Sequence, residues 1–100
     1  MSDARAYIFL QQRLDLRWCA QLYTQGTLKV ETNPCKSVLS ALDRLLSGAR
    51  DGQKVLRAPE LEAALFDKLF TKSREMWSEE VTFRALIDSE PYLLSIRMVP

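Results

Sequence analysis

The chain has 100 residues, of which 47% are hydrophobic and 27% charged, and its formal net charge is +1. This hydrophobic content excludes a disordered tail, and three Gly with four Pro exclude a collagen-like or linker-like chain. A net charge this small argues against a broad nucleic-acid-binding surface, which needs several clustered Lys or Arg on one face. The composition therefore predicts a single globular domain over residues 1–100.

No stretch of the sequence resembles a targeting signal or a membrane span. The start of the chain lacks a basic segment followed by a long apolar run and a small-residue cleavage site. The longest uninterrupted apolar stretch, Ala6–Leu10, is far shorter than the ~18 residues that a spanning helix requires. We therefore expect a cytoplasmic protein with no membrane partner.

The first segment fits a helix that begins at Ser2 and Asp3 and ends before Gly26. Such a helix would be apolar on two sides, which indicates a central position or a shared surface. One side is formed by Tyr7, Leu10, Leu14, Trp18 and Leu22, and the other by Ile8, Phe9, Leu16, Cys19, Ala20 and Tyr23.

The alternative for this segment is a hairpin over residues 16–32 that turns at 24–27. Its core-facing residues would be Leu16, Trp18, Ala20, Leu22, Leu28 and Val30. We favour the helix because Gln-Gly is a weaker turn signal than Asn-Gly.

The next segment carries the clearest helix signals, and they predict a helix over residues 34–47. Asn33 is a good N-cap, Pro34 suits the first helical position, and Gly48 stands where a C-cap is expected. A further helix over residues 59–77 begins at Pro59 and has Glu60 and Glu62 in its first turn, where the helix dipole favours negative charge.

The last part of the chain again allows two interpretations. Ser78 followed by two Glu predicts a helix over residues 79–88. Alternating apolar residues on both sides of the turn at 88–91 instead indicate a hairpin over 81–99, and helix and strand are equally supported for 92–99. We expect a mainly α fold, a compact helical domain of three to five helices. The alternative is an α+β fold with hairpins at 16–32 and 81–99.

The residues give little support to catalysis, metal binding or a bound cofactor. The chain has no His, and its two Cys are not in a metal-binding spacing. Cys35 is the best candidate for a reactive thiol, because it would lie in the first turn of the predicted helix beside Lys36. A packing role is favoured for both Cys19 and Cys35. We therefore expect a protein that is not an enzyme and has neither a metal nor a cofactor.

The apolar surface of the first segment favours a protein that binds another protein, as an adaptor, a regulator or an inhibitor, or that forms a homodimer. Residue types that often anchor interfaces occur there. The predicted partner-binding residues are Tyr7, Arg13, Arg17, Trp18 and Tyr23.

A second hypothesis uses the basic segment 44–57. Arg50, Lys54 and Arg57 could contact an acidic partner or a nucleic-acid backbone. No aromatic residue lies between these charges, which argues against stacking on single strands. Nucleic acid is therefore an unexpected partner, and a thiol-dependent enzyme is less expected still.

Overall fold

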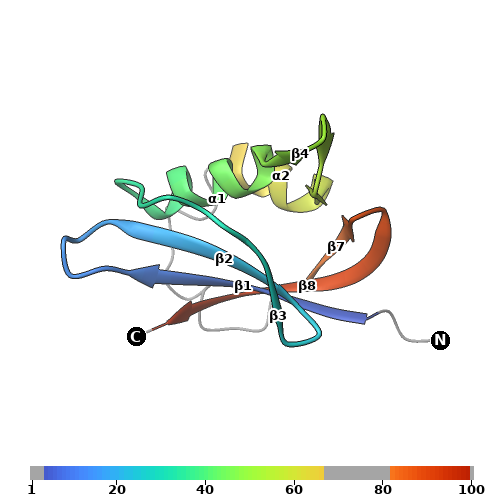
Figure 1. Ribbon diagram of the computed structural model, residues 1–100, viewed down its shortest axis with the longest axis horizontal. Helices are drawn as coiled ribbons and strands as arrows, with labels where there is room; N and C mark the ends of the chain where they lie inside the picture. Colours follow the sequence, from blue (N-terminus) through green and yellow to red (C-terminus); the bar gives the residue numbers. More distant parts are fainter. Residues whose placement is uncertain (1–3, 67–81, 100) are drawn as a thin grey trace.

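The computed structural model describes residues 4–66 and 82–99, and this part of the chain is mostly β-sheet (Figure 1). The predicted mainly α fold is therefore wrong. The strands are β1 Ala4–Gln12, β2 Trp18–Thr24, β3 Thr27–Glu31, β4 Ala49–Arg50, β5 Gln53–Lys54, β6 Leu56–Arg57, β7 Thr82–Ile87 and β8 Glu90–Val99. The two described helices are α1 Val38–Ser47 and α2 Pro59–Phe66.

The main sheet has six strands in the order β3-β2-β1-β8-β7-β6. Its neighbouring strands run antiparallel, except that β1 and β8 pair in parallel at the centre. A second sheet consists of the short pair β4 and β5. Both helices lie over one face of the main sheet (Figure 1), which we call the inner face.

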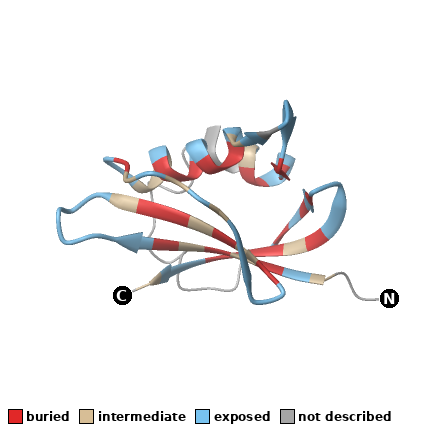
Figure 2. Ribbon diagram, viewed as in Figure 1, coloured by how far each residue is buried: buried red, intermediate tan, exposed pale blue. Residues whose placement is uncertain are grey.

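The core lies between the inner face and the helices (Figure 2). Strand β1 shows why these residues form strands: Ala6, Ile8 and Leu10 are fully buried, whereas Tyr7 and Phe9 between them are half-buried on the opposite, outer face. This segment is apolar on two sides because a strand has two faces, but each stripe of the predicted helix mixes residues of both: Tyr7 and Leu10, placed on one stripe, lie on opposite faces of the sheet.

The hairpin interpretation is correct for most of residues 16–32. Gln25 and Gly26 both have positive φ, 51° and 78°, in a two-residue turn between β2 and β3. Ala20 and Leu22 face the core as this interpretation requires, but Leu16 precedes β2 and is exposed. Leu28 is exposed as well, because the register shifts between Leu22 and Tyr23 and turns it to the outer face.

The helix predicted over 34–47 exists but begins later. Ser37 is the N-cap of α1, and its side-chain oxygen accepts a hydrogen bond from the Ser40 N–H. Cys35 lies outside the helix, in a bridge whose backbone groups pair with Trp18 at 2.7 and 2.8 Å. Cys35, which we expected in the first helical turn after Pro34, therefore pairs with the sheet instead.

Helix α2 begins at Pro59 as predicted, and residues 67–77 of that prediction lie outside the described part of the chain. The helix predicted over 79–88 is wrong for its described residues, and 79–81 lie outside them. Residues 82–99 form the alternative hairpin, in which Phe83, Ala85 and Ile87 are buried. Asp88 and Ser89 make its turn, with φ of 51° and 68°.

Candidate functional site

Within residues 4–66 and 82–99, the sheet has an unpaired edge where β6 ends beside β7. Leu56 pairs with Ile87 and Arg57 with Leu86, so the same register would place Pro59 opposite Arg84. Pro59 has no N–H to donate, and it begins α2 instead of continuing the strand. Among the residues that the structure describes, the pairing of β7 on this side therefore stops before Arg84.

The turn at Asp88 and Ser89 determines which backbone groups of β7 face this edge. A two-residue hairpin turn is closed by a hydrogen-bonded pair, here Ile87 with Glu90, and bonded and non-bonded pairs then alternate along the strands. Arg84 and Leu93 form a non-bonded pair, so the N–H and C=O of Arg84 point away from β8 and toward the open edge. Pro91 also occupies a non-bonded position, where its missing N–H does not weaken the hairpin.

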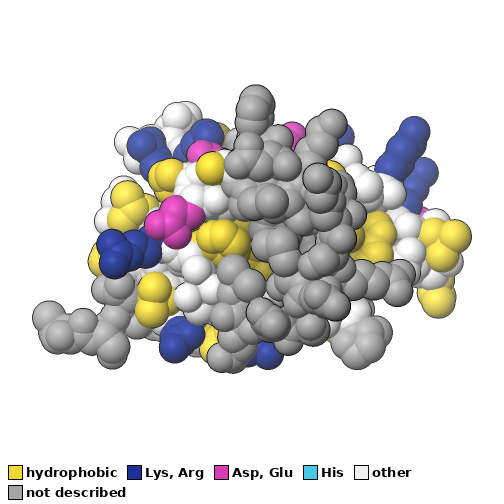
Figure 3. Space-filling view, turned by 180° about the vertical axis from the view of Figure 1, so that it is seen from behind, with side chains coloured by type: hydrophobic (Ala, Val, Ile, Leu, Met, Phe, Trp, Pro, Cys, Tyr) yellow, Lys and Arg dark blue, Asp and Glu magenta, His cyan; other side chains and the backbone are white. Residues whose placement is uncertain are grey.

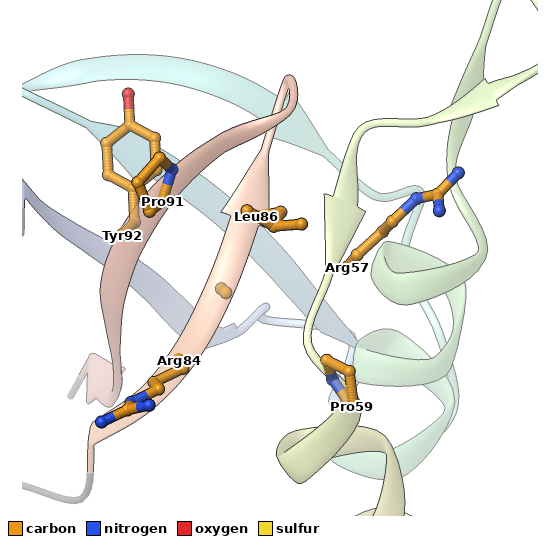
Figure 4. Close-up of a pocket in the computed structure, with 7 residues that line it drawn as sticks. Arg57, Pro59, Arg84, Leu86, Pro91 and Tyr92 are labelled. Atoms are coloured by element: carbon orange, nitrogen blue, oxygen red, sulfur yellow. The ribbon is translucent and has the colours of Figure 1, made fainter.

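A groove of about 570 Å³ lies at this edge, and we call it the β7 groove. It is lined by Arg57, Pro59, Arg84, Ala85, Leu86, Pro91 and Tyr92. Leu86 projects from β7 toward β6, while Arg84 and Arg57 extend to opposite sides of the groove (Figure 4). The groove thus combines an apolar floor, two cationic side chains and a strand edge.

Both arginines of the β7 groove are exposed. Within 4–66 and 82–99, neither Arg57 nor Arg84 takes part in an ion pair, and no carboxylate lines the groove. Lys54 provides a contrast, because its Nζ lies 3.5 Å from Oε1 of Glu62. Among the described residues, no acidic group neutralises the positive charge at the groove.

The predicted partner-binding residues do not form one surface. Tyr7 and Tyr23 lie opposite each other on β1 and β2, on the outer face of the sheet. Phe9 lies 6.0 Å from the Tyr7 ring and 5.4 Å from the Tyr23 ring, and Arg97 lies 5.9 Å from the centre of the Tyr7 ring. The two tyrosines thus belong to one aromatic cluster.

The other three predicted partner-binding residues lie elsewhere. Arg13 and Arg17 are in the loop between β1 and β2, and Trp18 begins β2 on the inner side. The predicted helix that would have carried all five residues does not exist, because this segment forms β1, a loop and β2.

The basic segment is divided between elements. Arg50 and Lys54 belong to the β4–β5 pair, whereas Arg57 lies in β6 and lines the β7 groove. Sequence reasoning missed Arg84 because it treated residues 79–88 as a helix. The alternation of Thr82, Arg84 and Leu86 with buried residues was the signal that could have found it.

Both cysteines are free thiols with 6% of their surface exposed. The Cys35 thiol donates a hydrogen bond to the carbonyl oxygen of Asn33 at 3.2 Å. Because Cys35 precedes the N-cap of α1, the argument for activation by a helix N-terminus does not apply. Nowhere in the described chain do three His, Cys, Asp or Glu residues gather as a metal site would need, and neither described helix could cross a membrane.

Comparison of the chain with protein-family models, with curated proteins and with solved structures gives no match.

Proposed function

We propose that this protein is a non-catalytic binding protein that takes up an extended segment of another protein as an added strand at β7. The observation that carries the proposal is the outward-facing backbone of Arg84 beside the β7 groove. Strand addition of this kind draws its affinity from main-chain hydrogen bonds and its specificity from alternate side chains.

The opposite edge of the sheet is less suited to this role. Strand β3 carries an irregularity in its pairing with β2 and an exposed Lys29, both of which are devices that discourage further strand pairing. At the β7 edge, by contrast, Pro59 ends the pairing with β6, and the β7 groove lies beside the remaining part of the strand. The two edges therefore differ in a way that favours a ligand at β7.

The charge of the groove indicates the chemistry of the bound segment. A residue directly opposite Arg84 in an added strand has its side chain on the same face as Arg84, within reach of the guanidinium group. An acidic residue at that position, with apolar residues beside it to cover Leu86, fits the groove best. We propose an adaptor, a regulator or an inhibitor that binds such a segment in the cytoplasm, where the free thiols Cys19 and Cys35 would remain reduced.

The test is selection of extended peptides on the full chain, followed by affinity measurement with edge variants. Arg84→Pro removes the outward N–H without breaking a bond to β8, and Arg84→Gln removes only the charge. We expect enriched peptides to carry an acidic residue, to lose binding to Arg84→Pro, and to bind Arg84→Gln up to about fivefold more weakly. Peptides that bind the proline variant as well as the unmodified chain would refute strand addition.

A further inference from the structure

The loop between β1 and β2 exposes two leucines at one end of the molecule. Leu14 is 106% exposed and Leu16 is 71% exposed, and the loop extends beyond the helices (Figure 1). We call the loop 13–17 the leucine tip. In the view from behind, hydrophobic and basic side chains both lie at this end (Figure 3).

The leucine tip is an ordered turn that would normally contain glycine. The Leu16 N–H donates to the Arg13 carbonyl at 2.9 Å, and the Arg13 N–H donates to the Arg17 carbonyl at 2.7 Å. Leu16 follows this turn with φ of 68°, the left-handed position that Gly usually occupies in such a loop. A leucine here both strains the backbone and exposes an apolar side chain, so folding does not explain its presence.

A basic pocket lies beside the leucine tip. It has a volume of about 340 Å³ and is lined by Arg17, Pro34, Cys35, Lys36, Ser40 and Arg44. No carboxylate is among these lining residues. A site with three cationic side chains and a serine hydroxyl suits an anion such as a phosphate group.

The one acidic residue of the tip contacts Arg17 within the tip itself. Oδ1 of Asp15 accepts a hydrogen bond from the Arg17 N–H at 3.1 Å, and Oδ2 lies 4.0 Å from Nε of Arg17. The tip and the pocket together contain four basic residues and this single carboxylate. The apolar tip is therefore surrounded by net positive charge.

We propose that this end of the molecule binds the surface of an anionic lipid membrane. Leu14 and Leu16 enter the boundary between head groups and acyl chains, and the basic pocket takes a lipid phosphate. A bilayer fits these observations better than a protein partner, because a fluid apolar layer accepts two projecting leucines without a matching socket. We expected no membrane partner because no apolar run is long enough for a membrane-spanning helix. That argument does not apply to a loop that contacts only the membrane surface.

The test uses the full chain and vesicles of phosphatidylcholine with and without phosphatidylserine. Trp77→Phe leaves Trp18, beside the leucine tip, as the single tryptophan and as a fluorescence reporter. We expect co-sedimentation and a blue shift of Trp18 emission with phosphatidylserine only, and weaker binding at high salt.

Two variants separate the apolar and charged contributions. Leu14→Ser with Leu16→Asn should weaken vesicle binding about tenfold or more while the fold is retained. Lys36→Gln with Arg44→Gln should weaken it by more than about tenfold, since each basic residue near an anionic surface contributes roughly fivefold. Circular dichroism confirms that each variant folds.

The matched controls change the same residue types at other exposed positions. Leu28→Ser and the pair Arg5→Gln with Lys29→Gln should leave vesicle binding within about twofold. Equal binding to neutral vesicles, equal loss in the controls, or a response to free inorganic phosphate without any to vesicles would overturn the proposal. Absence of vesicle binding together with self-association that depends on Leu14 would overturn it in favour of a protein contact.

Discussion

The two hairpin turns that flank the centre of the sheet solve the same geometric problem with different residues. The β7–β8 turn uses Asp88 and Ser89 at positive φ, and Asp is a residue that tolerates this conformation. The β1–β2 loop uses Leu16 at φ of 68° and leaves its side chain in water. The residues of the β7–β8 turn suit its backbone conformation, whereas Leu16 in the β1–β2 loop does not. Residues that do not suit their backbone conformation tend to occur at functional positions.

The largest contrast should come from one substitution made at two leucines four positions apart. Leu10→Ala in β1 removes a fully buried side chain and should lower the free energy of unfolding by about 2–5 kcal/mol. Leu14→Ala in the leucine tip should change it by less than about 0.5 kcal/mol. Urea denaturation measures both, and similar losses would show that the tip is packed in solution.

A smaller effect is expected at the β7–β8 turn. Ser89→Val places a β-branched residue at φ of 68° and should destabilise the protein by about 1–2 kcal/mol. Ser89→Gly is the matched control and should be neutral or slightly stabilising. Thermal unfolding followed by circular dichroism checks the pair, and a stable valine variant would contradict the assigned turn.

The leucine tip should respond in the opposite direction. Leu16→Asn relieves the positive-φ strain and should raise the free energy of unfolding by about 0.5 kcal/mol. Leu14→Asn, which makes the same change outside the strained position, should have no effect on stability. If Leu16→Asn is destabilising in urea, the left-handed conformation of this residue is not the one adopted in solution.

The smallest expected effect concerns the ion pair within the tip. Asp15 and Arg17 are both more than half exposed, and their charged atoms are 4.0 Å apart. Arg17→Gln should therefore change stability by less than about 0.5 kcal/mol, and high salt should reduce that difference further by screening the pair. A larger loss in denaturation experiments would show that Arg17 also supports the turn.

The sequence indicated the second half of the fold better than the first. The alternation in 82–99 and the Asp-Ser turn are local signals, and the hairpin alternative followed from them correctly. In Ala4–Gln12, both faces of the strand are apolar, because Ile8 is buried in the core while Tyr7 joins the outer aromatic cluster. Continuous apolar runs fit a helix and a buried strand equally well, and only the pairing partners distinguish them.

The candidate site was predicted only through Arg57. Its groove exists because Pro59 stops β6 opposite Arg84, a relation between residues far apart in the sequence. Cys35 gives a second example of a long-range contact that local signals miss. Its bridge to Trp18 lies where we expected the first turn of the helix, and α1 begins later. Local signals identify caps and turns, but they do not specify which strands become neighbours.

The parallel pairing of β1 with β8 has a consequence for biosynthesis. The central strand contact joins Ala4–Gln11 to residues 92–99, so the sheet cannot close until nearly the whole described chain has left the ribosome. Until then, β1 can pair with β2 on one side, but its other edge has no partner strand. Such long-range contacts slow folding and leave the nascent chain open to aggregation through this unpaired strand.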